Sequence, residues 1–151
     1  MTIHTYSFLD VMCVMTGPGG VVNMGGNSGV SKEGITIEAT EDIGTTTYGA
    51  GGEWMHSLHA ARPAKAMVRI LKTSPINALL STLFALQTST ASLFGQNQIL
   101  VSDIGRGDIV TCFGVRFGQF PSITWAEDAN MNEWSFIVGR VNWNLGDGQV
   151  V

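Results

Sequence analysis

One change of periodicity constrains this chain more than any other feature. Residues 68–73 alternate like a strand, and from Ser74-Pro75 onward the apolar spacing is that of a helix. Serine is a favoured N-cap, and proline fits the first helical position because that residue needs no N–H donor. No other segment has this pattern, so the sequence predicts one amphipathic helix near 75–88 in an otherwise β protein.

The predicted helix has one apolar face that we expect to pack on the core. Its members are spaced three and four residues apart, as one side of a helix requires. They are Ile76, Leu79, Leu80, Leu83 and Phe84, and Gln87 completes the row. The opposite face is uncharged, which is typical of a face that touches another protein.

The remaining segments read as strands separated by glycine-rich turns. We expect strands at residues 5–16, 21–24, 35–40, 63–73, 98–103, 108–117, 123–126 and 133–143. Trp125 and Trp134 lie in two of these strands and are predicted to be core residues. The length of 151 residues and the absence of a visible boundary predict a single domain over 1–151.

Residues 41–60 fit this scheme least well. The segment is rich in threonine and contains Gly49, Gly51 and Gly52, and its apolar residues do not complete a core face. It reads as an extended hairpin or a long loop. The neighbouring Trp54 and Met55 would be costly to expose without a partner, because aromatic residues and methionine are enriched at interfaces.

The charge content indicates a surface covered by other subunits or by small polar residues. Only 13% of residues are charged, against about 25% in typical soluble domains. The formal net charge is −4, and no basic patch is visible, which argues against direct nucleic-acid binding. The opening residues do not resemble a signal peptide, and no apolar run is long enough for a membrane helix, so we expect a cytoplasmic location.

No catalytic, cofactor or metal site is predicted. Cys13 and Cys112 lie in apolar runs and are expected to be reduced core thiols, although a bridge between them stays open. His56 and His59 would share a helical face, but in extended chain they point apart, and His4 has no evident partner. Gly107 lies between Arg106 and Asp108 in a predicted β-turn, so this tripeptide is interpreted as a turn and not as a recognition motif.

Several segments together resemble the tail tube proteins of contractile-tailed bacteriophages. They are Thr5-Tyr-Ser-Phe-Leu-Asp10, Gly17-Pro-Gly-Gly20, Glu33-Gly-Ile-Thr-Ile-Glu38, Met55-His-Ser-Leu-His-Ala60, Val68-Arg-Ile-Leu-Lys-Thr-Ser-Pro-Ile-Asn-Ala78, Gly95-Gln-Asn-Gln-Ile99, Arg106-Gly-Asp-Ile-Val-Thr-Cys112 and Glu133-Trp134. The resemblance covers nearly the whole chain. It implies two packed antiparallel sheets forming a barrel-like sandwich with one flanking helix, and a fold related to the type VI secretion tube protein.

The resemblance also implies a function. It predicts hexameric rings that stack into a hollow tube inside a contractile sheath, through which DNA passes without specific binding. The expected partners are copies of the chain itself and the sheath, baseplate and terminator proteins, in a virion tail that is assembled in the host cytoplasm. No cofactor and no enzymatic activity are expected.

For the contact between rings, the best candidate is the 41–60 segment, with Thr46, Tyr48, Trp54 and Met55 as its interface residues. The glycine-rich segment 17–34 is a secondary candidate. An ordinary hairpin that completes the barrel is the alternative interpretation of residues 41–60. Two alternative functions also remain at this point: another tail or secretion-machine component, such as a terminator or baseplate hub protein, and a β-sandwich module that binds a ligand.

Overall fold

The structure is a computed structural model that describes residues 3, 5–25 and 30–147. A short 3-10 helix at Phe8–Asp10 precedes the first strand. The other elements are β1 (Val11–Gly17), β2 (Gly20–Asn23), β3 (Val30–Ala39), β4 (Gly44–Tyr48), β5 (Trp54–Leu58), β6 (Ala64–Leu71), α1 (Ile76–Gln87), β7 (Asn97–Asp103), β8 (Asp108–Phe117), β9 (Met131–Val138) and β10 (Arg140–Asn144). His4 and residues 26–29 of the glycine-rich segment lie outside the described residues.

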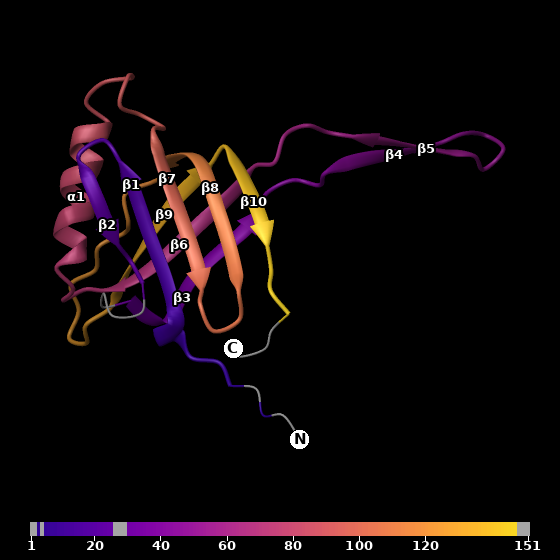
Figure 1. Cartoon of the computed structure of the whole chain (residues 1–151). Helices are drawn as coiled ribbons and strands as arrows, with labels where there is room; N and C mark the ends of the chain where they lie inside the picture. The colour runs from indigo at the N-terminus through magenta and orange to yellow at the C-terminus, as the bar shows by residue number, and fades with distance from the viewer. Residues whose placement is uncertain (1–2, 4, 26–29, 148–151) are drawn as a thin grey trace.

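Two layers of antiparallel strands form the body of the molecule (Figure 1). The first layer has the order β2-β1-β7-β8-β10, and the second has β9-β6-β3. The end of β8 also pairs with β9, so this strand belongs to both layers. The predicted β sandwich is therefore confirmed, and the sheet folds over on itself without closing into a barrel.

Two glycines make the corner at which the chain crosses between the layers. Gly114 interrupts β8 with φ +61, and Gly139 separates β9 from β10. The Gly139 N–H donates to the Phe113 carbonyl at 3.1 Å. A Cβ on Gly139 would lie 3.3 Å from the Gly114 carbonyl oxygen, so both strands approach closely where they bend.

The core lies between the two layers. Inward-facing residues of β6 and β9 alternate with outward-facing ones, as expected for strands with one buried face. Trp134, Phe117 and Phe136 are the largest fully buried side chains, and Phe84 and Phe120 join them through edge-on ring contacts of 5.1 to 5.4 Å. Trp134 is thus a core residue, as predicted.

Helix α1 flanks the body beside β2 (Figure 1). Its start matches the prediction within one residue, and the Ser74 hydroxyl accepts the Ile76 N–H at 3.3 Å. Leu80 and Leu83 are buried, and Ile76 and Phe84 pack against the core.

The prediction for Leu79 is wrong, because this side chain is 51% exposed. The helix covers an edge of the sandwich, and only a narrow stripe through Leu80, Leu83 and Gln87 is buried. Leu86 is also exposed, at 41%.

Buried polar side chains tie the helix to both layers. Gln87 and Asn97 exchange two amide hydrogen bonds of 2.8 and 2.5 Å, and the Gln87 amide also donates to the Pro18 carbonyl at 2.9 Å. On the other layer, the Trp134 indole N–H donates to the Asn77 side-chain oxygen at 3.0 Å. These bonds satisfy groups that would otherwise be buried without partners.

Four expectations about the strands need correction. The single strand expected at 133–143 is two strands, β9 and β10, which Gly139 separates. No strand forms at 123–126, and Trp125 is 82% exposed in an irregular segment, where the Lys72 ammonium lies 5.1 Å from its ring centroid. A cation–π contact with a lysine can stabilise a tryptophan ring at the surface, so Trp125 does not need a place in the core. The first strand begins only at Val11, after the 3-10 turn, and β3 begins at Val30 and not at residue 35.

The turn between β7 and β8 holds both ends of the described chain. Gly107 has φ +77, as the predicted turn requires, and its N–H donates to the Asp103 carbonyl at 2.8 Å. The Arg106 guanidinium pairs with Asp103 and lies 4.7 Å from the ring centroid of Tyr6, near the N-terminus. The Asp108 carboxylate accepts the Gly146 N–H at 2.8 Å, near the C-terminus.

Candidate functional site

The hairpin formed by β4 and β5 stands apart from the body. The chain leaves the second layer at the end of β3 and returns to it at β6, and between them the hairpin projects far from the two layers (Figure 1). Among the described residues, these two strands pair only with each other. An isolated two-stranded hairpin is only marginally stable in water, so this geometry calls for a partner.

The strand register gives the hairpin two different faces. Tyr48 lies opposite Trp54, and Thr46 lies opposite His56, so these four side chains share one face, with Leu58 at its base. We call this the aromatic face. Met55 lies opposite Thr47 on the other face. The structure therefore brings together three of the predicted interface residues, and it places Met55 on the reverse side.

The aromatic face is open to solvent. Tyr48 is 72% exposed, Trp54 67% and Leu58 75%. Large apolar side chains gathered at such exposures mark an interaction surface on a soluble protein. Leu58 was missed in the sequence, although its spacing of two from His56 and four from Trp54 is the signal that would have placed it there.

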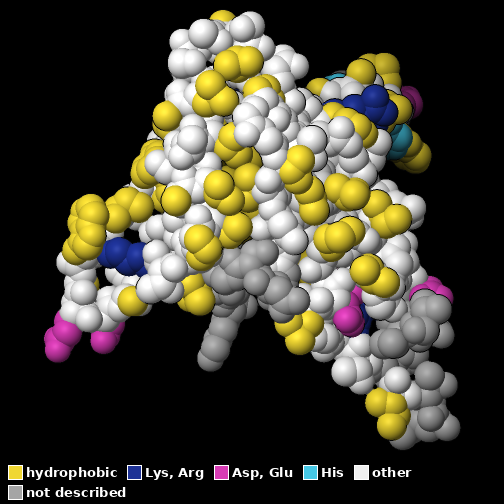
Figure 2. Space-filling model, turned by 60° about the vertical axis from the view of Figure 1, so that its left-hand side comes forward, with side chains coloured by type: hydrophobic (Ala, Val, Ile, Leu, Met, Phe, Trp, Pro, Cys, Tyr) yellow, Lys and Arg dark blue, Asp and Glu magenta, His cyan; other side chains and the backbone are white. Residues whose placement is uncertain are grey.

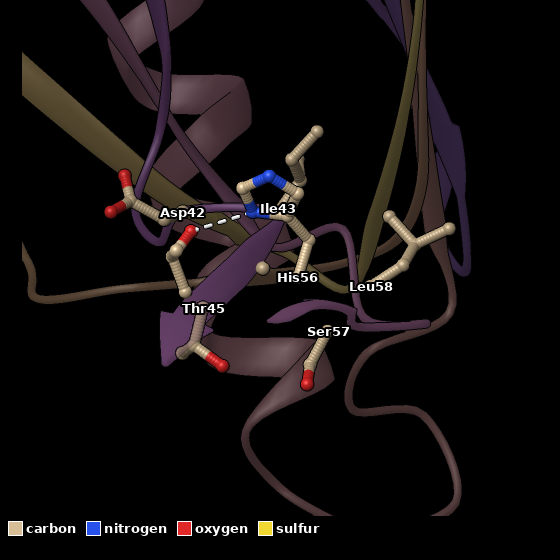
Figure 3. Close-up of a pocket in the computed structure, with 8 residues that line it drawn as sticks. Asp42, Ile43, Thr45, His56, Ser57 and Leu58 are labelled. Atoms are coloured by element: carbon tan, nitrogen blue, oxygen red, sulfur yellow. Dashed lines mark hydrogen bonds between the residues drawn. The ribbon is translucent and has the colours of Figure 1, made fainter. Parts of the chain in front are cut away.

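A shallow open hollow of about 420 Å³ lies at the base of the hairpin (Figure 3). His56 and Ile43 point to one side of the ribbon, and Thr45 and Ser57 point to the other. The His56 Nδ1 lies 2.9 Å from the Thr46 hydroxyl oxygen. In the described part of the chain, no three histidine, cysteine or acidic side chains gather in a way that could hold a metal ion.

The outward face of the first layer is nearly uncharged. The register of β2, β1, β7, β8 and β10 places these residues on it: Val21, Asn23, Met12, Val14, Thr16, Gln98, Leu100, Ser102, Ile109, Thr111, Phe113, Arg140, Asn142 and Asn144. Arg140 is the one charged residue among these positions. Figure 2 shows the adjoining side of the molecule, where hydrophobic side chains are spread over the middle and charged ones lie at the margins. We call the outward face of the first layer the neutral face.

The outward face of the second layer has a different character. Among its described side chains, five are charged: Glu38, Lys65, Arg69, Arg116 and Glu133. Arg69 pairs with Glu133 at 3.2 Å and also donates to the Thr36 hydroxyl at 3.0 Å, while Lys65 lies opposite Glu38. We call this surface the charged face. Its paired charges suit a surface that stays in contact with water.

The two cysteines are buried free thiols, as predicted. Burial, together with a smaller effect of the nearby Cys112, raises the pKa of Cys13 from 9.0 to about 12. Burial likewise raises the pKa of Cys112 to about 11. Thiols that remain protonated are poor nucleophiles and poor metal ligands, so these residues act as core side chains.

No helix in the described residues has the length and apolar character needed to cross a membrane.

Comparisons with known structures place the fold among contractile injection systems. A chain of the PVC sheath–tube complex in the extended state has a TM-score of 0.53 and 11% identity, over 88% of both chains. The tube-terminating cap of the anti-feeding prophage has a TM-score of 0.56 and 12% identity, over 97% of this chain and 94% of that one. The PVC sheath/tube terminator in the extended state has a TM-score of 0.55 and 15% identity, over 95% of this chain and 99% of that one.

A search of curated proteins finds no match. A family model described as the bacteriophage PhiTE tail tube protein matches residues 3–146. This match covers nearly the whole chain and agrees with the fold of the structural neighbours. The chain belongs to the phage tail tube family.

Proposed function

We propose that this tail tube subunit forms hexameric rings that stack into a hollow tube, and that DNA passes through the tube inside a contractile sheath. The observation that carries the proposal is the exposed aromatic face on a hairpin that projects from the body of a tail tube family member. A ring needs two different complementary surfaces on each subunit, and stacking needs another pair. A chain with so few charges can provide several such contacts.

The hairpin is the proposed contact between successive rings. Thr46, Tyr48 and Trp54 lie on its aromatic face, and Met55 extends the contact on the reverse side. The projection supports this role, because a segment that leaves its own body can reach a neighbour without moving the core. The alternative, a hairpin that completes its own barrel, is not favoured, because β4 and β5 add no strand to either layer.

The proposed conduction of DNA needs a lumen that does not hold phosphate. Basic side chains bind DNA through its backbone and release counterions. The net charge is −4, and two of the three basic residues on the charged face lie opposite acidic residues of the neighbouring strands. Such a chain suits a passage in which DNA slides without specific binding.

The remaining partners follow from the proposed place in the tail. One structural neighbour belongs to a sheath–tube complex and another to a sheath/tube terminator, which supports sheath and terminator proteins as partners. A baseplate protein would receive the first ring, and assembly would take place in the host cytoplasm. The role is structural, with no catalytic step.

The test is a deletion of Thr46–Glu53, which removes the last three residues of β4 and the turn at the tip of the hairpin. We expect a folded monomer that no longer polymerises. Negative-stain micrographs should show long hollow tubes for the wild-type protein and none for the variant. Normal tubes from the variant would refute the assignment of the hairpin.

Two controls separate this function from the alternatives. Circular dichroism and thermal melting should be close to wild type for the deletion variant, since the hairpin contributes no strand to the body. A terminator would stop at single rings even at high wild-type concentration, whereas a tube protein elongates. A ligand-binding module would remain monomeric.

A further inference from the structure

The aromatic face of the hairpin must be covered by something when the protein assembles, and its own body does not cover it. We infer that the aromatic face of one copy lies across the neutral face of a second copy of this chain. This inference rests on the proposed function, and it names the surface that receives the hairpin.

The first argument concerns charge. Tyr48, Trp54 and Leu58 would lose their water on binding, and charged groups are depleted in the buried centre of interfaces. The two layers offer alternative receiving surfaces. The charged face would bury the Arg69–Glu133 pair and its neighbours, and desolvating such pairs is costly. The neutral face carries Arg140 as its one charged residue, at the edge strand β10.

The second argument concerns apolar surface. On the neutral face, Val21 is 65% exposed, Ile109 43%, Met12 40% and Phe113 38%. These side chains come from three of its five strands, β1, β2 and β8, so they form a broad surface and not a single protrusion. Polar threonine, serine and asparagine side chains lie between them and can form hydrogen bonds with Thr46 and His56 of an incoming hairpin.

The third argument concerns dimensions. Each hairpin strand has five residues, which at about 3.4 Å per residue gives a length of about 17 Å. The neutral face has five strands, whose four spacings of about 4.8 Å span about 19 Å. The aromatic face can therefore cross the strands of the receiving layer from one edge to the other.

Such a contact is heterologous, because the hairpin and the neutral face are different parts of each subunit. Each copy would offer one hairpin and one receiving face, so the contact repeats from copy to copy without pairing two identical patches. It therefore serves a polymer and not a closed dimer.

Photo-crosslinking tests the inference directly. The full-length protein with p-benzoylphenylalanine in place of Tyr48 is assembled, irradiated and digested, and the crosslinked peptides are identified by mass spectrometry. We expect intermolecular crosslinks in residues 11–23, 97–117 and 140–144. Crosslinks that fall mainly in β3, β6, β9 or α1 would overturn the inference while leaving the tube intact.

A pair of charge variants gives a second readout. Thr111 and Met67 are both half-buried and lie near the centres of the neutral and charged faces. Thr111→Glu should lower the polymerised fraction in a sedimentation assay by about tenfold or more, since a buried unpaired charge costs at least the 1.4 kcal/mol that a factor of ten represents. Met67→Glu should change it less than about twofold, because that residue faces water and has basic neighbours.

The outcomes are distinct for the two proposals. A larger loss for Met67→Glu than for Thr111→Glu would overturn the inference. If Thr111→Glu fails to fold, Asn142→Glu on the exposed edge of the same face takes its place. A wild-type protein that stays monomeric would overturn the proposed function and this inference together, whereas tubes with crosslinks elsewhere would overturn the inference alone.

Discussion

The body of the molecule and its hairpin use the same kinds of residue in opposite ways. In the body, Trp134 is 1% exposed, its ring packs against other aromatic rings, and its indole N–H has an acceptor. In the hairpin, Trp54 is 67% exposed, and its cross-strand neighbour Tyr48 is equally open. Trp134 contributes its packing energy within one chain, whereas Trp54 can contribute packing energy only when another molecule covers it.

This contrast teaches that folding and assembly are separated along the chain. The body forms its core from both layers and the helix, so it does not need residues 44–58. The hairpin has little to stabilise it alone. Substitutions in the body should therefore change stability, and substitutions on the aromatic face should change assembly.

The largest effect is expected in the helix, at two adjacent leucines. Leu80 is fully buried and Leu79 is half exposed. Leu80→Ala should lower the free energy of unfolding by roughly 2–5 kcal/mol, because it leaves a cavity in a packed core. Leu79→Ala should cost less than about 1 kcal/mol. Equal losses in urea denaturation would show that the buried stripe is wider than described.

The next effect concerns the buried amide pair. Gln87→Leu removes both hydrogen bonds to Asn97 and leaves that amide unsatisfied, so we expect a loss of roughly 1–3 kcal/mol. The double variant with Asn97→Leu should recover part of this loss, because both unpaired groups are then gone. Additive losses in the double variant would contradict the pairing.

A smaller effect should depend on pH. Unfolded thiols ionise near pH 9.0, whereas burial keeps Cys13 and Cys112 protonated until about pH 12 and about pH 11. Above pH 9 the unfolded state therefore binds fewer protons, and stability falls as pH rises. Between pH 8 and pH 10.5, the melting temperature should fall further for the wild type than for the double variant Cys13→Ala, Cys112→Ala. Parallel profiles would mean that the thiols do not contribute.

The smallest effect on stability is expected in the hairpin. Trp54→Ala should change the free energy of unfolding by less than about 0.5 kcal/mol, because the side chain is largely exposed and its strand adds nothing to the two layers. The same change should strongly reduce tube formation in micrographs. A melting temperature that falls as far as it does for Leu80→Ala would show that the hairpin belongs to the folding unit.

Local signals predicted the helix well, since it starts within one residue of the expected position and Leu80 and Leu83 are buried, although the N-cap is Pro75 and not Ser74. They could not give the width of its buried stripe, because that depends on where the helix sits relative to two layers made of distant strands. The error at Leu79 has this origin. Trp125 shows a related limit: aromatic character predicts burial on average, but Lys72 comes beside this ring only in the folded chain.

The position of the candidate site could be predicted from the sequence, but the residues that share each of its faces could not. Its apolar residues fail to complete a core face, and this signal was enough to single out residues 41–60. The register that puts Tyr48, Trp54 and His56 together and sends Met55 to the other side depends on which residues pair across the turn. The neutral face could not be predicted, because it joins strands that are far apart in the sequence.

The turn at Arg106-Gly107-Asp108 has a practical consequence. It contacts Tyr6 and Gly146, so the two ends of the described part of the chain lie at the same end of the body. A fluorophore or gold label joined to either terminus would then mark one end of every subunit. In a stack of identical contacts, such labels would all point the same way and would report the polarity of the filament.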